Sequence, residues 1–328
     1  MIADYTAAEV AAEVALAEER IRPYIRETPL EHSPFLSAQT NCEVFLKMEN
    51  LQVTNSFKAR GAFSALLALS SEERERGVVT SSTGNHANAC AYAMPLLGID
   101  GEIWVPANAS RAKLDQLKAR GAKLVLIDDD PGKVEVLARA EADRTGHIFV
   151  SPYNDPRVVG GQGTIAVEVL RQLGRAPGAV FVPVGGGGLI AGIAGYFKAN
   201  AAHTEVVGCL PSNSPVMSEC AKAGREMGVP CESSLSDATV GSFEPGSITF
   251  PICRDCVNDW VLVSEDEIAA AIRTVVAYHS VLVEGAGALS VASLLKEHEY
   301  YVGRTVVLVL SGARIPLDKL AGVLADRV

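Results

Sequence analysis

Short runs of β-branched and apolar residues alternate with longer helical patterns along most of this chain. This alternation is typical of a parallel sheet in which helices connect successive strands. We therefore predict an α/β fold made of doubly wound, mostly parallel sheets. The runs are VVTSS from Val78, EIWVP from Glu102, KLVLID from Lys123, HIFVS from His147, AVFVPV from Ala179, TEVVGCL from Thr204 and TVVLVLSG from Thr305.

The length of the chain predicts two lobes. Its 328 residues exceed the roughly 250–300 residues at which a single hydrophobic core stops growing. From Val78 to Val150 the predicted strands are closely spaced, as in a compact lobe, and no linker rich in Gly, Ser or Pro sets this block apart. We therefore predict a small domain of residues 77–151 inserted into a large domain of residues 1–76 and 152–328.

The charge balance and the opening segment predict a cytoplasmic protein. Lys and Arg total 29 and Asp and Glu total 39, so the net charge is −10, which repels nucleic-acid phosphates and anionic lipids. Residues 1–21 read as a Glu-rich amphipathic helix without the basic and apolar regions of a signal peptide. No run approaches the roughly 20 apolar residues that a membrane helix needs. We expect neither nucleic acid nor a membrane as a partner.

The cysteines do not resemble a disulfide framework. They are odd in number and scattered over a long chain, so we expect reduced thiols at apolar positions. One CxxC pair is present, but no second pair and no nearby His completes a zinc site. The seven cysteines are Cys42, Cys90, Cys209, Cys220, Cys231, Cys253 and Cys256.

Four consecutive glycines lie between a predicted strand and a predicted helix. Such a segment exposes a row of backbone N–H groups at the positive end of a helix, which suits a phosphate. A tight βα turn is the alternative, although it needs fewer glycines. The four residues are Gly185, Gly186, Gly187 and Gly188.

A dinucleotide is a second alternative, because Gly186, Gly188 and Ala191 satisfy the G-x-G-x-x-G/A pattern. That site also requires an acidic residue near the end of the next strand, where this chain has Leu210. No Lys-Ser or Lys-Thr follows the glycines, so the Walker pattern fails as well. The sequence therefore favours another phosphate ligand.

The segment NSFKARGA places a lysine in the first turn of a predicted helix. Asn55 or Ser56 is expected to cap this helix, which begins at Phe57 and runs toward Leu69. The helix dipole, Phe57 and the nearby Arg60 all disfavour the ammonium form of Lys58, which leaves more nucleophilic amine. A solvated lysine is the alternative for this motif taken alone.

The segment SSTGNHANACAYA, from Ser81 to Ala93, places hydroxyls and backbone N–H groups at another predicted helix N-terminus. This arrangement predicts a second anion site, suited to a carboxylate. His86 is either a base or a structural residue, and its type alone does not decide between the two.

In chain order, the motifs SFKARGA, STGNHANA, GGQGTIAVEVL, VGGGGLIAGIA, EGAGALSVA and LSGAR resemble the serine/threonine dehydratase and serine racemase family. These are fold-type II pyridoxal-phosphate enzymes with a tryptophan synthase β-like fold. Several motifs in the right order are far more specific than any one of them. The resemblance implies pyridoxal 5'-phosphate as cofactor, a homodimer, a large domain that binds the cofactor, and a small mobile domain that closes over the substrate.

The resemblance also assigns roles to individual residues. Lys58 matches the catalytic lysine that forms a Schiff base with the cofactor, and Thr83 stands where serine racemases have a second catalytic acid/base. The cofactor-binding positions are Phe57 against the ring, Asn85 at the ring hydroxyl, Gly185, Gly186, Gly187 and Gly188 around the phosphate, Ser311 at the pyridine nitrogen and Glu284 near the ring edge. The substrate-binding positions are Ser82, Thr83, Gly84, Asn85 and His86 around the carboxylate. Arg314, which departs from the family pattern, is a further candidate for substrate binding.

The implied reaction is elimination of water from a small β-hydroxy-amino acid such as L-threonine or L-serine, followed by release of a 2-oxo acid and ammonia. A serine at the pyridine nitrogen holds no proton there, unlike an aspartate, which suits prompt loss of a β-leaving group. Lys58 takes the α-proton, and in this family the hydroxyl is thought to receive its proton from the cofactor phosphate.

Three departures from the family pattern bear on substrate and side reactions. Arg314 replaces the usual Asn and is either a ligand for a second substrate carboxylate or a surface charge. Leu210 and Val216 stand where cation-activated relatives have acidic ligands, so we expect no metal. Thr83 replaces the racemase serine, and its stiff β-branched side chain predicts little racemisation.

Several alternatives stay open. A hydroxyaspartate, or a substituted serine such as phenylserine or a hydroxyectoine-pathway intermediate, competes with threonine as substrate. A β-replacement synthase usually reads Gly-Asn-Thr where this chain has Gly84-Asn85-His86, and a catalytically silent binding protein would have lost Lys58. No regulatory domain follows the last motif, which predicts a catabolic enzyme without feedback control.

Overall fold

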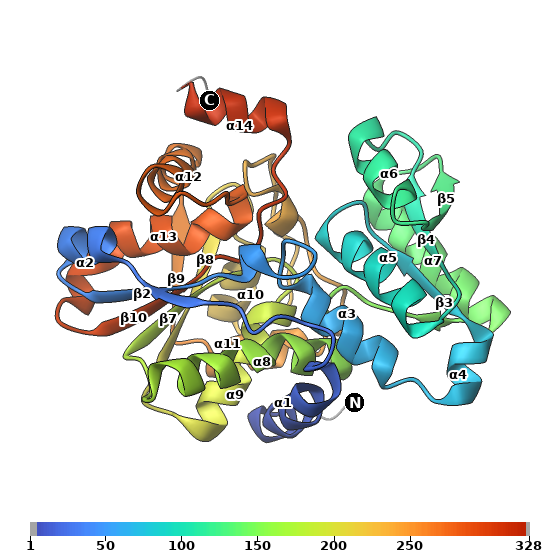
Figure 1. Ribbon diagram of the computed structural model, residues 1–328, viewed down its shortest axis with the longest axis horizontal. Coiled ribbons are helices and arrows are strands. Elements are labelled where there is room, and N and C mark those ends of the chain that lie inside the picture. Colours follow the sequence, from blue (N-terminus) through green and yellow to red (C-terminus); the bar gives the residue numbers. More distant parts are fainter. Residues whose placement is uncertain (1–4, 326–328) are drawn as a thin grey trace.

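The computed structural model describes residues 5–325, which form two sheets that lie side by side with helices on both faces of each (Figure 1). All strand pairs but one are parallel. The predicted α/β fold with mostly parallel sheets is confirmed.

The larger sheet has six strands in the order β1-β2-β10-β7-β8-β9, with β1 antiparallel to β2. Its central strands β7, β8 and β10 are buried on both faces, as parallel strands usually are, whereas β1 at the edge has no buried residue. Val180 and Val182 of β7 pack toward α8 and α9, whereas Ala179 and Phe181 pack toward α12 and α13. The strands are β1 (Leu30–His32), β2 (Glu43–Lys47), β7 (Ala179–Pro183), β8 (Glu205–Pro211), β9 (Asp259–Val263) and β10 (Thr305–Val309).

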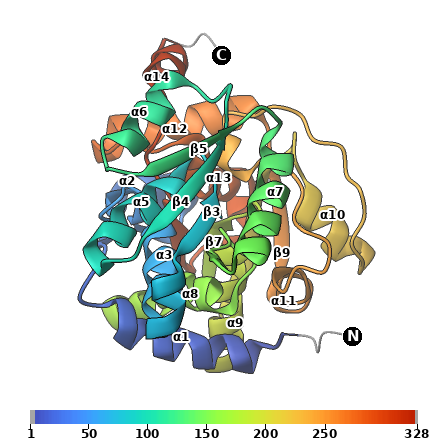
Figure 2. The same cartoon turned by 90° about the vertical axis from the view of Figure 1, so that its right-hand side faces the viewer.

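The smaller sheet has four parallel strands in the order β5-β4-β3-β6. Helices α5 and α6 cover one face and α7 covers the other (Figure 2). The sheet spans Val78–Phe149, inside the residues 77–151 expected to form the small domain, and the mobility of that domain stays a prediction. Residues 1–4 and 326–328 of the expected large domain lie outside the described residues. The strands are β3 (Val78–Ser81), β4 (Gly101–Pro106), β5 (Lys123–Ile127) and β6 (Ile148–Phe149).

Helix α3 joins the two halves of the molecule, because it packs against α8 on one side and α5 on the other. Helix α1 begins with a capping box between Thr6 and Glu9 and buries Val10 and Val14, as the amphipathic pattern predicts. The helices are α1 (Ala7–Ile21), α2 (Pro34–Thr40), α3 (Lys58–Leu67), α4 (Ser71–Arg76), α5 (Asn85–Leu97), α6 (Arg111–Lys118), α7 (Pro131–Thr145), α8 (Pro156–Leu173), α9 (Gly188–Asn200), α10 (Val216–Ala223), α11 (Thr249–Cys256), α12 (Glu265–His279), α13 (Gly285–Glu297) and α14 (Leu317–Leu324). Three short 3₁₀ turns cover Glu49–Leu51, Asp237–Thr239 and His298–Tyr301.

The expected cap of α3 is wrong. Phe57 is the N-cap, and no side chain caps the helix. Ser56 instead forms a backbone bridge with Gly312, and the Phe57 N–H donates to the Ser311 carbonyl at 3.0 Å. Residues 55–57 are therefore used to tie the start of α3 to the end of β10.

All seven cysteines are free, and all except Cys231 are buried. Among the described helices, none is long and apolar enough to cross a membrane.

Candidate active site

The candidate site lies where the carboxyl ends of β3, β7 and β10 meet the start of α3. Carboxyl ends of parallel strands are the usual place for ligand binding in open α/β sheets. The Ala313 N–H donates to the Asn55 carbonyl at 3.0 Å, which adds to the bonds between α3 and the end of β10. Lys58 and Ser311 are thus held close together by backbone pairing, from positions far apart in sequence.

The Lys58 amine lies at this site. Its Nζ donates to the Pro152 carbonyl at 2.8 Å and lies 5.2 Å from the centre of the Phe57 ring. Burial lowers the pKa of Lys58 to about 8, against weaker opposing effects of Cys90, Glu135 and Glu284. The expected loss of ammonium character is therefore present, with burial as its main cause.

Arg60 does not contribute to this effect in the expected way. Its guanidinium is fully buried and bonded to Glu49 and Glu168, with N–O distances of 2.7 Å to each. The charge is neutralised within that network, which includes Lys47. Arg60 therefore anchors the first turns of α3 and does not act on the amine.

The four glycines form a tightly enclosed turn between β7 and α9. Gly187, the N-cap of α9, has φ +87° and provides no capping side chain. A Cβ at Gly186 would lie 2.6 Å from the Tyr153 ring, and one at Gly187 would lie 2.9 Å from Thr249. A turn that excludes side chains and leaves helix N–H groups uncapped fits a phosphate. At the end of β8, Leu210 is buried and apolar, so the dinucleotide alternative gains no support.

The loop between β3 and α5 brings a second set of hydrogen-bond donors to the site. Ser82, Thr83 and Gly84 are half-buried, and the Gly84 N–H donates to Ser82 Oγ at 3.1 Å. Gly84 is the N-cap of α5 and provides no capping side chain. The arrangement fits a carboxylate, as the sequence predicts.

The His86 imidazole points away from this loop. Its Nε2 lies 2.9 Å from Thr80 Oγ1 and 3.1 Å from the Val150 carbonyl oxygen, and the residue is buried. Burial, followed by the charge of Lys58, lowers the pKa of His86 to about 3. The structure favours the structural alternative for this side chain, and its predicted part in substrate binding is limited to the backbone.

Asn85 at the start of α5 and Glu284 at the start of α13 meet at the site. Asn85 Nδ2 donates to Glu284 Oε1 at 2.7 Å, and the Arg314 N–H donates to Glu284 Oε2 at 2.8 Å. Burial raises the pKa of Glu284 to about 7 despite these bonds. Asn85 Oδ1 is buried and has no partner among the described residues, which leaves it for a bound group. Ser311 is also buried, at the end of β10.

The Arg314 guanidinium bonds to Gln116 of α6, in the half of the molecule that holds the smaller sheet. Burial, followed by the nearby Arg120, lowers the pKa of Arg314. Arg314 therefore joins the two halves through Glu284 and Gln116, and its binding of a substrate carboxylate stays a prediction.

Two residues of this region were missed by the sequence analysis. Tyr153 covers the glycine turn, and its place directly after the strand HIFVS was a usable signal, because strand ends gather at the site. Glu135 of α7 carries an oxygen, Oε1, that is buried without a partner among the described residues. Burial and contact with Glu244 raise the pKa of Glu135 to about 7. No sequence motif marks Glu135 or Glu244.

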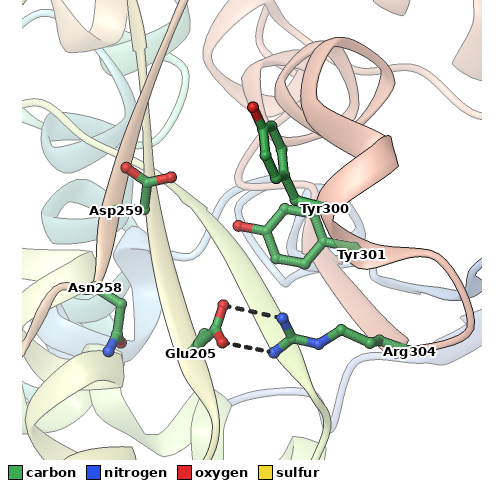
Figure 3. A pocket seen from close by; sticks show the side chains of 6 residues that line it. All are labelled: Glu205, Asn258, Asp259, Tyr300, Tyr301 and Arg304. Carbon is green, nitrogen blue, oxygen red and sulfur yellow. Dashed lines mark hydrogen bonds and ion pairs between the residues drawn. The ribbon is translucent and has the colours of Figure 1, made fainter.

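A separate cavity of about 500 Å³ lies at the opposite edge of the larger sheet (Figure 3). Figure 3 shows the Arg304 guanidinium paired with Glu205, at 3.0 Å. The cavity is near the amino ends of β8, β9 and β10, so it is no part of the candidate site. Its lining residues are Glu205, Asn258, Asp259, Tyr300, Tyr301 and Arg304.

The family profile of pyridoxal-phosphate dependent enzymes matches residues 21–312. Among curated proteins, an L-threonine ammonia-lyase of Thermotoga maritima is 38% identical over 93% of this chain and 75% of its own length. A catabolic L-threonine dehydratase of Escherichia coli K12 is 37% identical over 93% of both chains.

Solved structures also match this chain over nearly its whole length. Maize serine racemase has a TM-score of 0.90 at 29% identity, covering 96% of this chain and 97% of its own. The processed threonine deaminase isoform 2 of Solanum lycopersicum also has a TM-score of 0.90, at 31% identity over 97% of this chain and 87% of its own.

The side-chain-free glycine turn, the unpaired Asn85 oxygen and the Lys58 amine of lowered pKa fit pyridoxal phosphate. The family match makes pyridoxal phosphate the cofactor of this enzyme. The predicted family, cofactor and enzyme class are confirmed by the matches. The chain belongs to the pyridoxal-phosphate dependent enzyme family.

Proposed function

We propose that this enzyme is a dehydratase, or ammonia-lyase, that converts L-threonine, L-serine or a similar small β-hydroxy-amino acid into a 2-oxo acid and ammonia. The observation that carries the proposal is the Lys58 amine, which has a pKa of about 8 and donates to the carbonyl of Pro152, the residue before Tyr153, which covers the glycine turn. The threonine ammonia-lyase and dehydratase relatives support the same reaction class.

The cofactor would be held by residues that follow strands β3, β7 and β10 and by the N-cap residues of α3 and α13. Gly185, Gly186, Gly187 and Gly188 would bind its phosphate, Phe57 would pack on the ring, and Asn85, Glu284 and Ser311 would contact polar atoms at the ring edge. When bound, pyridoxal phosphate supplies an electron sink for the bond at the substrate's α-carbon. Ser311 provides a hydroxyl where a carboxylate would hold a proton, which suits elimination.

The chain's own residues then orient the substrate and move one proton. The loop from Ser82 to His86 binds the substrate carboxylate through hydroxyls and through N–H groups at the start of α5. Lys58 takes the α-proton, because an amine with a pKa near 8 is partly free at neutral pH and still basic. Ala59, which follows Lys58 in α3, and Cys90 of α5 are both buried in the apolar core beside the site, and this packing limits the access of water.

We further propose that the enzyme acts in the cytoplasm as a homodimer and that residues 77–151 close over the substrate. The two halves share an apolar core where α3 packs on α5. Away from that core they are joined by polar contacts, among them Arg314 with Gln116 and Lys113 with Asp237 at 3.6 Å. Such contacts permit relative motion of the halves. Light scattering of the purified protein measures the oligomeric state.

A screen of hydroxy-amino acids for 2-oxo acid release tests the proposal. L-threonine and L-serine are the expected substrates, with hydroxyaspartate and phenylserine as arms for the other substrate classes. O-acetylserine with sulfide tests β-replacement. Release of no 2-oxo acid from any hydroxy-amino acid, with turnover of O-acetylserine, would show that the enzyme is a synthase.

A further inference from the structure

Glu244 ties together three segments that surround the glycine turn. Its Oε1 accepts from Arg139 Nη2 at 2.7 Å, and its Oε2 accepts from Asn154 Nδ2 at 2.8 Å. Its own N–H donates to the Tyr153 hydroxyl at 2.8 Å. One residue thus joins helix α7, the loop after β6 and the loop before α11.

Tyr153 is the part of this cluster that touches the glycine turn. A Cβ added at Gly186 would lie 2.6 Å from its ring, and one added at Gly188 would lie 2.9 Å from its Cβ. The Ile248 N–H donates to Asn154 Oδ1 at 3.0 Å, and Thr249 Oγ1 donates to the Gly186 carbonyl at 2.8 Å. The loop that carries Glu244 is therefore connected to the turn on both sides.

Arg139 belongs to the other half of the molecule. It lies on α7, which covers the smaller sheet, and its guanidinium is 4.2 Å from the centre of the Phe149 ring of β6. Glu135, one turn earlier on α7, faces the same Glu244 carboxyl group. The position of α7 relative to the larger sheet is thus fixed in part by Glu244.

The ion pair between Arg139 and Glu244 is only half-buried, with 38% and 27% of the side chains exposed. Ion pairs with this exposure contribute little to folding stability. The importance of the pair lies in its position. Through Glu244 it connects α7, which covers the smaller sheet, to Tyr153, which covers the glycine turn.

We propose that Glu244 is a positioning residue that couples the smaller half of the molecule to cofactor retention. With Arg139 in contact, Glu244 holds Tyr153 over the glycine turn and keeps that turn shaped for a phosphate. Loss of the contact loosens Tyr153 and speeds release of the cofactor. The inference rests on the proposed role of Gly185–Gly188 as the phosphate site.

The test compares Glu244→Gln and Arg139→Gln with Arg144→Gln, a matched control on the same helix. Arg144 pairs with Glu141 of its own helix at 2.6 Å and makes no contact with Glu244. The measurements are the equilibrium constant and the rate for dissociation of pyridoxal phosphate from the holoenzyme, alongside the thermal midpoint. We expect about tenfold weaker and faster-exchanging cofactor in the two test variants, the size of one charge-assisted hydrogen bond. The control is expected to match wild type.

The double variant Arg139→Gln with Glu244→Gln is expected to bind cofactor no worse than the worse single variant, because both changes remove one contact. Unchanged cofactor binding in Glu244→Gln with a lowered thermal midpoint would overturn the proposal, since that result is the signature of a purely structural role. If Glu244→Gln fails to fold, Tyr153→Phe removes the hydroxyl that accepts from Glu244 and keeps the ring, and unchanged cofactor exchange there overturns the proposal equally. Gly186→Asp distinguishes failure of the phosphate site from failure of the coupling. If Gly186→Asp keeps its cofactor in full, the phosphate site itself is refuted. If Gly186→Asp loses cofactor while Glu244→Gln binds it as the wild type does, the coupling alone is refuted.

Discussion

Lys58 shows how burial sets chemistry at the scale of a single residue. The amine is enclosed by the Pro152 carbonyl and the Phe57 ring, and burial brings its pKa to about 8. His86 lies nearby and is buried with a pKa near 3, so it stays neutral. Of these two nitrogen bases, the lysine is thus the one whose protonation state changes near neutral pH.

Replacing Lys58 by Ala should therefore abolish turnover. The loss is expected to exceed the ~10²–10⁴-fold that removal of a general base usually costs, because the variant also loses the covalent anchor of the cofactor. Borohydride reduction of the wild type followed by peptide mass analysis should find the cofactor on Lys58. Lys133→Ala, on the surface of α7, is the control. Near-normal turnover in Lys58→Ala would sink the mechanism.

Thr83 carries the prediction on stereochemistry. Racemisation needs a second acid/base on the face of the α-carbon opposite Lys58, and the methyl group of Thr83 restricts the hydroxyl to few rotamers. We expect little D-serine from the wild type and a higher ratio of racemisation to elimination in Thr83→Ser. Chiral analysis of the residual serine after partial turnover measures this ratio. Abundant D-serine from the wild type would show that Thr83 acts as the second base.

At the scale of the elements, seven strands were predicted from their apolar runs, whereas β1, β2 and β9 were not. Strand β2 contains Lys47, whose charge hides the pattern but is paired in the interior with Glu168. Strand β9, at the edge of the sheet, carries the run WVLV after Asp259, so the sequence does signal it and the prediction missed it. Their places depend on partners far away in sequence, such as the pairing of Val44 with Val306.

The glycine turn and the serine-threonine loop were predictable because backbone groups at helix starts follow from local sequence. Tyr153 had a usable signal in its place after a predicted strand, whereas Glu135 and Glu244 had none, since their meeting depends on how α7 and the loop before α11 pack together. The cap of α3 was predicted wrongly for the same reason, because Ser56 pairs with Gly312 at the end of β10. Local sequence rules identify the backbone N–H donors at helix starts, whereas packing between distant segments determines which side chains cover those donors.

The end of β8 carries a prediction about metal. Leu210 and Val216 are buried apolar residues and offer no oxygen to a hard cation. Activity should therefore be insensitive to EDTA. The measurement is the initial rate before and after chelation, with Mg²⁺ added back, and strong reactivation by Mg²⁺ would contradict the reading of this segment.

At the scale of the whole molecule, Glu284 connects the two halves at the candidate active site. One carboxylate oxygen accepts from Asn85 at the start of α5, and the other from the backbone of Arg314, whose side chain reaches Gln116 of α6. The carboxyl group is buried, so the same position that joins the halves also carries an electrostatic cost when it ionises.

This cost predicts how stability changes with pH. The pKa of Glu284 is raised from 4.5 to about 7 in the folded protein, so between these values the folded state holds a proton that the unfolded chain has lost. The free energy of unfolding should therefore fall as pH rises through this window, by roughly 3 kcal/mol in total, and level off above it. Below the window the effect is absent, because both states are protonated.

The Gln side chain of Glu284→Gln cannot ionise. As pH rises between 4.5 and about 7, the wild type should therefore lose unfolding free energy relative to this variant. Denaturant unfolding of cofactor-depleted protein at several pH values measures the difference, and using a difference cancels titration at other sites such as Glu135. Glu299→Gln, at an exposed position, serves as the control and should show no such trend. Because one amide cannot accept from both Asn85 and the Arg314 N–H, the variant is expected to be less stable than wild type at low pH and to recover relative to it as pH rises. A wild type that gains stability over the variant between pH 5 and 7 would mean that Glu284 ionises readily in the fold, and that its two hydrogen bonds outweigh its burial.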